Sequence, residues 1–315
     1  MKRTTKILAG VAGGLSFLAA VSVGGGLYLL DYALCPDMVS PQTAEQRIRE
    51  AYPQVRPWLD SLEQAGALRD TVVTSPDGPP LHAVYARAPR STCRTAIIVH
   101  GYTDQAMEML HIGYLYHHDL HFNILLPDLR YAGKTPGDAI QMGWKDREDV
   151  VRWIAAAPEL FGDSVKMVVH GISMGAATTM MTAGEPLPPA VRCFVEDCGY
   201  TSVWDQFAKE LKEQFGLPAF PLLHTASTLC DWKYGWNFRE ASALEQLKKC
   251  DRPMLFIHGD EDTYVPTWMV YDLYQAKSGL KELWVTSGVD HAHSYQKYPA
   301  EYTRKVRAFT DKYME

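Results

Sequence analysis

The sequence predicts an α/β fold in which a mostly parallel sheet is covered on both faces by helices. Two observations support this prediction. Short apolar runs alternate with segments of helical periodicity through most of the chain, which is typical of a doubly wound parallel sheet. In addition, the apolar run 165–170 leads directly into a glycine-rich turn at 171–175 and then into a helix of small residues. Such a strand–turn–helix unit fits the same architecture.

A β-hairpin is expected first. The turn signal Ser-Pro-Asp-Gly at 75–78 joins two antiparallel strands, 71–74 and 81–88. From there, strands and helices alternate. We expect further strands at 95–99, 122–126, 165–170, 191–196, 254–258 and 282–286, and helices at 105–118, 146–157 and 301–313. In sheets of this kind, functional side chains gather at the carboxyl ends of the strands.

The N-terminal segment has the composition of a membrane anchor. Lys2, Arg3 and Lys6 precede residues 7–30, a run of twenty-four residues without a charged side chain. As a helix this run would be about 36 Å long, which is enough to cross a bilayer core of about 30 Å. Because a basic start stays in the cytoplasm, we expect a single-pass protein of the cell membrane whose body lies outside the cytoplasm.

The alternative is a secretory signal that is cleaved near Ala20-Val21-Ser22 and releases a secreted protein. In either case, residues 1–35 are expected to be an N-terminal anchor or signal segment. Residues 36–69 are expected to form a helical linker, because apolar residues recur there at helical spacing. The α/β domain is then expected over residues 70–315, with an insertion at about 201–247.

Composition argues against several classes of function. The formal net charge is −6 and Lys and Arg do not cluster, so a nucleic-acid surface is not expected. The six cysteines show no C-x-x-C spacing, and His117 and His121 have no third ligand from another segment, so no metal site is expected. These histidines are better explained by their position at a helix end, where they complement the dipole. No phosphate-binding loop or dinucleotide fingerprint occurs, so no cofactor is expected.

The turn at 171–175 fits G-x-S-x-G, the nucleophile elbow, which holds a serine hydroxyl clear of a parallel sheet. The serine is Ser173, and its backbone is expected to be strained. A Cβ two residues before or after it would collide where the helix packs on its own strand, which explains the glycines. A serine in an ordinary glycine-rich turn would match the same short pattern, but the flanking strand and helix favour the elbow.

A serine hydroxyl needs a base to become a strong nucleophile, and the base needs an orienting carboxylate. With an elbow, the expected chain order is serine, then acid, then histidine. The ends of two later strands supply three acids and two histidines in that order: Asp260, Glu261, Asp262, His291 and His293. Periodicity alone does not choose among them.

An acyl-transfer site also needs backbone N–H groups directed at the developing oxyanion. The residue after the serine, Met174, supplies one candidate, and the loop after the first long strand supplies another at Tyr102. A glycine turn in which Thr103 or Asp104 caps the next helix would have the same sequence. Both interpretations can hold together.

Taken as an ordered set, these motifs resemble those of the α/β-hydrolases over residues 70–313. The resemblance is to membrane-anchored bacterial serine hydrolases of the esterase/lipase or prolyl-oligopeptidase-like branch. It implies Asp262 as the acid, through an H-G-x-x-D-x-x-V-P segment, and His291 as the base, through G-x-x-H-A-x-S-Y. Some relatives carry the acid at the position that is Asp197 here, and Asp260 and His293 remain alternatives.

A second segment of the resemblance begins at Asp128 and is similar to the family's D-x-R-G-x-G-x-S loop. Tyr131 and Thr135 replace the usual Gly and Ser. This difference concerns the fine shape of the loop and leaves the implied Ser–Asp–His triad unchanged.

The resemblance implies a serine hydrolase that cleaves a carboxylic ester or thioester through an acyl-enzyme, without a metal or cofactor. The insertion at 201–247 is rich in large apolar residues and is expected to form a short helical cap. Its apolar residues would form a pocket for a small-molecule or lipid-like acyl substrate, or the core of the cap itself. A serine peptidase of the prolyl-oligopeptidase type is one alternative, and a non-catalytic surface binding module on the same fold is another.

Overall fold

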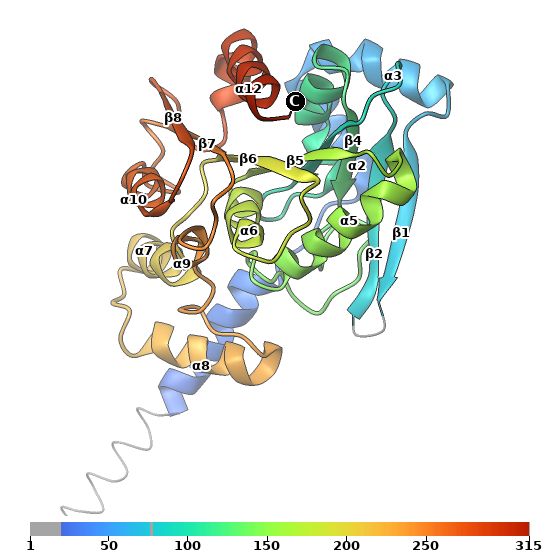
Figure 1. Cartoon of the computed structure of the whole chain (residues 1–315). Coiled ribbons are helices and arrows are strands. Elements are labelled where there is room, and N and C mark those ends of the chain that lie inside the picture. The colour runs from blue at the N-terminus through green and yellow to red at the C-terminus, as the bar shows by residue number, and fades with distance from the viewer. Residues whose placement is uncertain (1–19, 76–77, 315) are drawn as a thin grey trace, which may run out of the picture. The chain divides into compact units, whose positions relative to one another are not determined.

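The computed structural model of the chain describes residues 20–75 and 78–314 (Figure 1). The chain divides into two compact units. The sheet unit comprises residues 37–202 and 242–315, and the helical unit comprises residues 1–36 and 203–241. All of the strands of the described chain belong to the sheet unit.

The sheet unit is built on one sheet of eight strands in the order β1-β2-β4-β3-β5-β6-β7-β8. Its strands are β1 Arg69–Ser75, β2 Gly78–Ala86, β3 Arg94–Val99, β4 Asn123–Pro127, β5 Lys166–Ile172, β6 Val191–Asp197, β7 Met254–Gly259 and β8 Lys281–Thr286. β2 pairs antiparallel with β1 and with β4, and all other pairs are parallel. The mostly parallel sheet that the alternating pattern predicts is therefore confirmed, including the antiparallel hairpin at its start.

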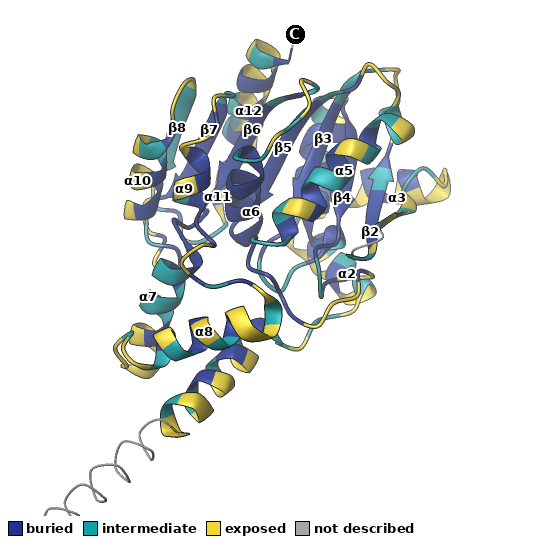
Figure 2. Ribbon diagram, turned by 60° about the horizontal axis from the view of Figure 1, so that its bottom comes forward, coloured by how far each residue is buried: buried dark blue, intermediate teal, exposed yellow. Residues whose placement is uncertain are grey.

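Helices cover both faces of this sheet (Figures 1 and 2). One face packs against α2 Pro41–Ala51, α3 Arg56–Gln64, α4 Leu110–Tyr114 and α12 Pro299–Tyr313, which share one buried cluster with the strands. The other face packs against α5 Asp146–Phe161, α6 Met174–Ala183 and α10 Trp268–Ala276, and α9 Ala243–Leu247 packs on α6 and α10. β4 and β7 are buried along their whole length because both of their faces are covered.

The segment expected to be a linker contributes to this core. After α2 come the 3₁₀ turn η1 Pro53–Val55 and α3, and their residues Val55 and Leu59 are fully buried. The helix expected at 105–118 is divided into the 3₁₀ turn η2 Ala106–Met109, α4 and the π-helical turn η3 Leu115–Asp119. A short helix, α11 Ser294–Lys297, precedes α12.

The helical unit contains α7 Val203–Phe215, α8 Leu222–Tyr234 and a helix over residues 20–34. The helix at 20–34 packs on α8 through glycine. A Cβ on Gly25 would lie 2.8 Å from Leu222 Cδ2, and one on Gly26 would lie 3.1 Å from Leu229 Cδ1. The absence of side chains at these positions lets the two helices approach closely.

The expected membrane span at residues 7–30 lies mainly outside the described residues. Its last part, residues 20–30, belongs to the helix that packs on α8. Within the described part of the chain, none of the helices has the length and apolar character needed to cross a bilayer. Two glycines of the uncharged run, Gly25 and Gly26, thus lie where this helix packs on α8.

Candidate active site

Ser173 lies between β5 and α6, where the chain turns sharply. Its φ is +56° and its ψ is −120°, a conformation that residues with a side chain rarely adopt. The Ser173 N–H donates to the Asp197 carbonyl at 2.8 Å and helps to hold this turn. A Cβ on Gly171 would lie 2.0 Å from the Gly175 carbonyl oxygen, and one on Gly175 would lie 2.1 Å from that of Val99. The expected collision is therefore found at both glycines, although Gly175 would meet the neighbouring strand β3 rather than the strand that precedes its helix.

The structure brings Ser173, His291 and Asp262 together after the carboxyl ends of β5, β8 and β7. His291 Nε2 lies 2.8 Å from Ser173 Oγ, and His291 Nδ1 lies 2.7 Å from Asp262 Oδ2. The other carboxylate oxygen, Asp262 Oδ1, accepts the N–H groups of Tyr264 and Val265 at 3.0 and 2.8 Å. With Nδ1–H donating to the carboxylate, Nε2 is left to accept the serine proton.

Electrostatics favour an ionised Asp262. Burial by itself raises the pKa of this carboxyl, but hydrogen bonds from His258 and His291 outweigh burial and lower the pKa to about 2. The carboxylate thus stays charged at neutral pH and can stabilise a protonated imidazole. The His291 side chain is 21 % exposed whereas that of Asp262 is fully buried, so the histidine is the more accessible of the pair.

The three alternative residues have other partners. Asp260 Oδ1 accepts the Gly288 N–H at 2.5 Å. His293 Nδ1 lies 2.6 Å from Asp290 Oδ1, and both side chains are more than half exposed. Asp197 accepts a hydrogen bond from a buried tyrosine.

The loop after β3 borders the serine. A Cβ on Gly101 would lie 3.6 Å from Ser173 Cβ, so Tyr102, the next residue, follows directly from a point of close approach. Met174, the other expected donor of a backbone N–H, is the first residue of α6. Both expected oxyanion donors therefore belong to segments that meet at Ser173.

His100 fixes the shape of this loop. The Leu129 N–H donates to His100 Nε2 at 2.9 Å, so Nδ1 carries the proton and donates to the Gly101 carbonyl at 2.8 Å. Burial lowers the pKa of His100 and keeps the ring neutral. One imidazole therefore connects the loop that contains Tyr102 to the loop that begins at Asp128.

The loop at 128–135 is wrapped around the carboxylate of Asp128, which accepts two backbone N–H groups at 2.8 and 2.9 Å. Gly133 has φ +55°, and a Cβ there would lie 2.2 Å from this carboxylate. Thr135 Oγ1 donates to the Asp128 carbonyl at 2.9 Å and accepts the His82 N–H at 2.8 Å. The threonine thus provides a hydroxyl that a serine could also provide, which explains why Thr135 is tolerated.

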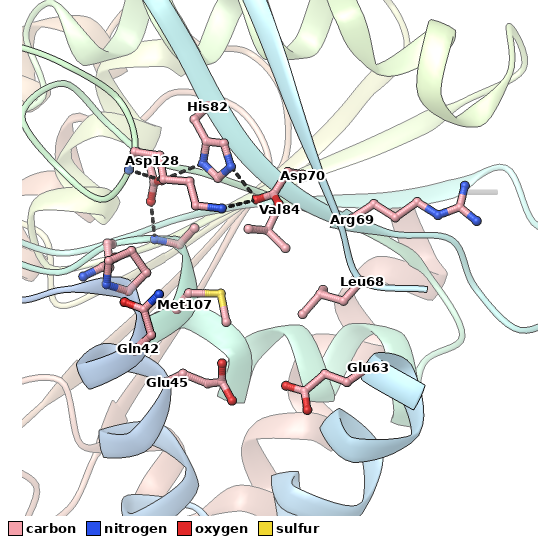
Figure 3. Close-up of a pocket in the computed structure, with 14 residues that line it drawn as sticks. Gln42, Glu45, Glu63, Leu68, Arg69, Asp70, His82, Val84, Met107 and Asp128 are labelled. Carbon is pink, nitrogen blue, oxygen red and sulfur yellow. Dashed lines mark hydrogen bonds and ion pairs between the residues drawn. The ribbon is translucent and has the colours of Figure 1, made fainter. Parts of the chain in front are cut away.

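His82 lies between Asp70 and Asp128 beside a cavity of about 220 Å³ (Figure 3). Its Nε2 is 2.7 Å from Asp70 Oδ1 and its Nδ1 is 2.7 Å from Asp128 Oδ2. Burial lowers the pKa of His82, but the bonds to the two acids outweigh burial and raise it. Among the described residues that line the cavity, none belongs to the group Ser173, His291 and Asp262.

A buried hydrogen-bonded chain behind the elbow was not anticipated from the sequence. Tyr302 Oη donates to Asp197 Oδ2 at 3.0 Å, and His170 Nε2 lies 2.9 Å from Tyr302 Oη. Tyr116 Oη lies 3.1 Å from His170 Nδ1. Burial raises the pKa of Asp197 to about 7 and lowers that of His170 to about 3, so the histidine is neutral. No sequence pattern links residues so far apart, although His170 directly precedes the elbow.

The residues that could bind a metal ion in one cluster, and also His117, already form hydrogen bonds within the protein. Cys198, Asp262 and His291 each place one ligand atom within 4.8 Å of the others, but the last two already bond to each other. Burial also raises the pKa of the Cys198 thiol well above its usual range, which disfavours a thiolate ligand. His117 accepts the Trp58 Nε1–H at 3.0 Å, and its Nε2 lies 3.0 Å from the Arg87 carbonyl. Its ring therefore joins structural elements.

A mostly parallel sheet, a serine in a strained strand–turn–helix junction and a histidine within hydrogen-bond distance define the class of serine hydrolases with an α/β-hydrolase fold. Comparison with known proteins agrees. The sequence profile of the prolyl oligopeptidase family matches residues 133–315, and the chain belongs to that family.

Individual relatives extend this result. The chain is 31% identical over 227 residues to the uncharacterized protein YqkD of Bacillus subtilis, covering 72% of this chain and 74% of that one. The esterase Pf2001 of Pyrococcus furiosus has a TM-score of 0.64 at 22% identity over 79% of this chain and 93% of that one. The acylaminoacyl peptidase of Pyrococcus horikoshii has a TM-score of 0.57 at 17% identity over 78% and 41%, respectively. The two solved structures share the fold of this chain.

Proposed function

We propose that this chain is a serine hydrolase that cleaves a carboxylic ester or thioester through an acyl-enzyme. The observation that supports it best is the continuous hydrogen-bonded series from Ser173 Oγ through both nitrogens of His291 to Asp262, with separations of 2.8 and 2.7 Å. These distances lie within the range needed for proton transfer between a nucleophile and its base.

In the first half-reaction, Ser173 Oγ attacks the substrate carbonyl carbon while His291 Nε2 takes the hydroxyl proton. The carbonyl π electrons move to oxygen, and the N–H groups of Tyr102 and Met174 stabilise the resulting oxyanion. Collapse of this intermediate breaks the bond to the alcohol or thiol, which receives the proton from His291. Water then repeats the sequence on the acyl-enzyme and releases the acid.

Asp262 has an orienting role in this scheme. Its ionised carboxylate holds the proton on Nδ1, so the lone pair at Nε2 faces the serine, and it stabilises the imidazolium that forms. The two backbone N–H groups that bond to Oδ1 fix the direction of the carboxylate itself.

A second candidate is a serine peptidase, because the chain belongs to the prolyl oligopeptidase family. The same three residues would serve, with His291 Nε2 protonating the leaving amine. We favour an ester or thioester because the insertion between β6 and α9 is rich in large apolar residues, which suits an apolar acyl substrate.

The first test compares wild type with Ser173→Ala for labelling by a fluorophosphonate and for hydrolysis of p-nitrophenyl esters of increasing chain length. We expect the variant to lose all labelling and at least about 10³-fold in kcat/KM. Ser287→Ala is the matched control, because Ser287 is an exposed serine in the loop after β8. Equal labelling of wild type and Ser173→Ala would rule out the assignment of the nucleophile.

The same preparation separates the substrate classes. Hydrolysis of esters without hydrolysis of acyl-peptide p-nitroanilides supports the esterase, and the reverse supports the peptidase. A folded wild-type protein that neither labels nor hydrolyses either panel would instead support the non-catalytic binding module.

We also propose that the N-terminal segment attaches the protein to the cell membrane, with the catalytic unit outside the cytoplasm. The support is the basic start at Lys2, Arg3 and Lys6 and the uncharged run that follows. The test is alkaline extraction of membranes, protease protection in intact cells and N-terminal sequencing of the mature protein. Release by alkali together with a new N-terminus near residue 22 would show a cleaved signal and a secreted protein.

A further inference from the structure

Exposed apolar side chains are concentrated in the helical unit. The described part of the chain has fourteen large apolar side chains that are exposed, and nine of them belong to this unit although it is much the smaller of the two. The nine are Val21, Val23, Leu27, Tyr28, Tyr32, Phe215, Leu217, Phe220 and Trp232. Such a concentration on a minor part of a protein indicates an interaction surface.

These side chains come from helices that are held together. The rings of Tyr28 and Tyr32 stack at 6.1 Å, and Tyr32 meets Phe215 edge-on at 5.7 Å. The Tyr32 hydroxyl donates to Gln214 Oε1 at 3.0 Å, which ties the helix at 20–34 to α7. The aromatic residues of the N-terminal helix and the end of α7 therefore form one continuous exposed strip.

α8 carries the two most exposed members of the set at or near its ends. Phe220, just before the helix, is 72% exposed, and Trp232, in its last turn, is 82% exposed. The contacts of Gly25 and Gly26 with Leu222 and Leu229 fix this helix to the helix at 20–34. A partner of the N-terminal helix would thus lie close to α8 as well.

The chain itself indicates which partner this is. Residues 1–19, outside the described part, lead directly into the helix at 20–34, and from residue 7 onward they carry no charge. If residues 7–24 cross a bilayer as proposed above, about 27 Å as a helix, the part of the helix at 20–34 that packs on α8 from Gly25 onward leaves the bilayer at its surface. α8, which is packed on that helix, must then lie at the same surface.

We propose that the exposed strip of the helical unit and the aromatic residues of α8 rest on the bilayer, with Trp232 and Phe220 in its interfacial layer. This proposal depends on the membrane attachment proposed above and is independent of the catalytic assignment. Trp and Tyr favour this layer because their rings are apolar while an N–H or O–H remains hydrated. Acidic and basic side chains alternate near the aromatic residues, for example Asp231 and Lys233 beside Trp232, so lipid charge is not required.

The test uses the full chain in phosphatidylcholine vesicles with bromine either near the headgroups or deep in the acyl chains. Bromine quenches tryptophan fluorescence at short range. We expect Trp232→Phe to remove at least half of the bromine-dependent quenching. Trp268→Phe is the matched control, because Trp268 is 51% exposed but belongs to the sheet unit, and it should leave the quenching unchanged.

Unchanged quenching in Trp232→Phe, or an equal loss in Trp268→Phe, would overturn the proposal. Stronger quenching by the deep bromines than by the shallow ones would also overturn the interfacial position. Vesicles with added phosphatidylglycerol should give the same result, since binding by lipid charge would increase the quenching there. Far-ultraviolet circular dichroism of every variant shows that it is folded, and fluorophosphonate labelling reports the catalytic proposal separately.

Discussion

Glycine has different roles in the two units of this protein. In the sheet unit, a Cβ on Gly171 or Gly175 would meet backbone oxygen at 2.0 or 2.1 Å. In the helical unit, a Cβ on Gly25 would meet only the end of the Leu222 side chain at 2.8 Å, and one on Gly24 would meet nothing within 4 Å. A backbone atom held in a strand or in a packed helix cannot move aside, whereas a leucine can change rotamer.

This difference shows how each unit is specified. In the sheet unit, rigid backbone holds each functional residue in one position. Two residues of the same type that lie close together in the sequence therefore cannot replace each other there. In the helical unit, the side chains between the helices can adjust their rotamers. Substitutions there should therefore change stability by small to moderate amounts. Substitutions in the two units should therefore differ in the size of their effects.

The largest effect is expected for two histidines only two residues apart. His291→Ala removes the base that bonds to Ser173 Oγ and should lower kcat/KM by about 10⁴-fold. His293→Ala removes an exposed histidine that bonds to Asp290 and should change it less than about 2-fold. Ester hydrolysis by the purified variants measures both. Comparable losses in the two variants would contradict the assignment of the base.

The second-largest effect is expected for stability, when a glycine of each unit is replaced by alanine. Gly175→Ala should lower the free energy of unfolding by more than about 3 kcal/mol, because its Cβ would overlap the carbonyl of Val99. In Gly25→Ala, the crowding of Leu222 opposes the gain of about 1 kcal/mol in helix propensity. The net change there should stay within about 1 kcal/mol. Denaturant unfolding measures both, and a strongly destabilised Gly25→Ala would remove the contrast.

The contrast between the two units also explains which features could be predicted from the sequence. Three features could be predicted because they depend on short segments of the chain. They are the elbow, the order of acid and histidine, and the alternation of strands and helices. The need for glycine at positions 171 and 175 follows from the sequence pattern alone. The sequence also left three acids and two histidines open, because the choice depends on how separate strand ends are aligned.

Other features could not be predicted because they join distant residues. The chain from Tyr116 through His170 and Tyr302 to Asp197 connects four elements that have no common local pattern. The uncharged run 7–30 predicts a membrane segment, and nothing local indicates that Gly25 and Gly26 receive side chains from α8. Composition identifies an apolar surface, but not which partner covers it.

The smallest expected effect concerns charge in the sheet unit. His82 connects β2 to Asp70 on β1 and to Asp128 after β4, and both bonds are strongest when the imidazole is protonated. Because the folded-state pKa of His82 is raised, its stabilising effect is complete below the unfolded pKa of about 6.5 and is lost as the pH rises through the folded value.

His82→Gln should therefore lower the free energy of unfolding more at pH 5.5 than at pH 8.5, with a difference of about 1–2 kcal/mol. Asp70→Asn should reduce this pH-dependent part without abolishing it, because the carboxylate of Asp128 still faces the ring. Urea unfolding at the two pH values measures both variants. If His82→Gln costs the same at both, the ring contributes through packing alone, and the charged bonds in this corner of the sheet unit do not stabilise it.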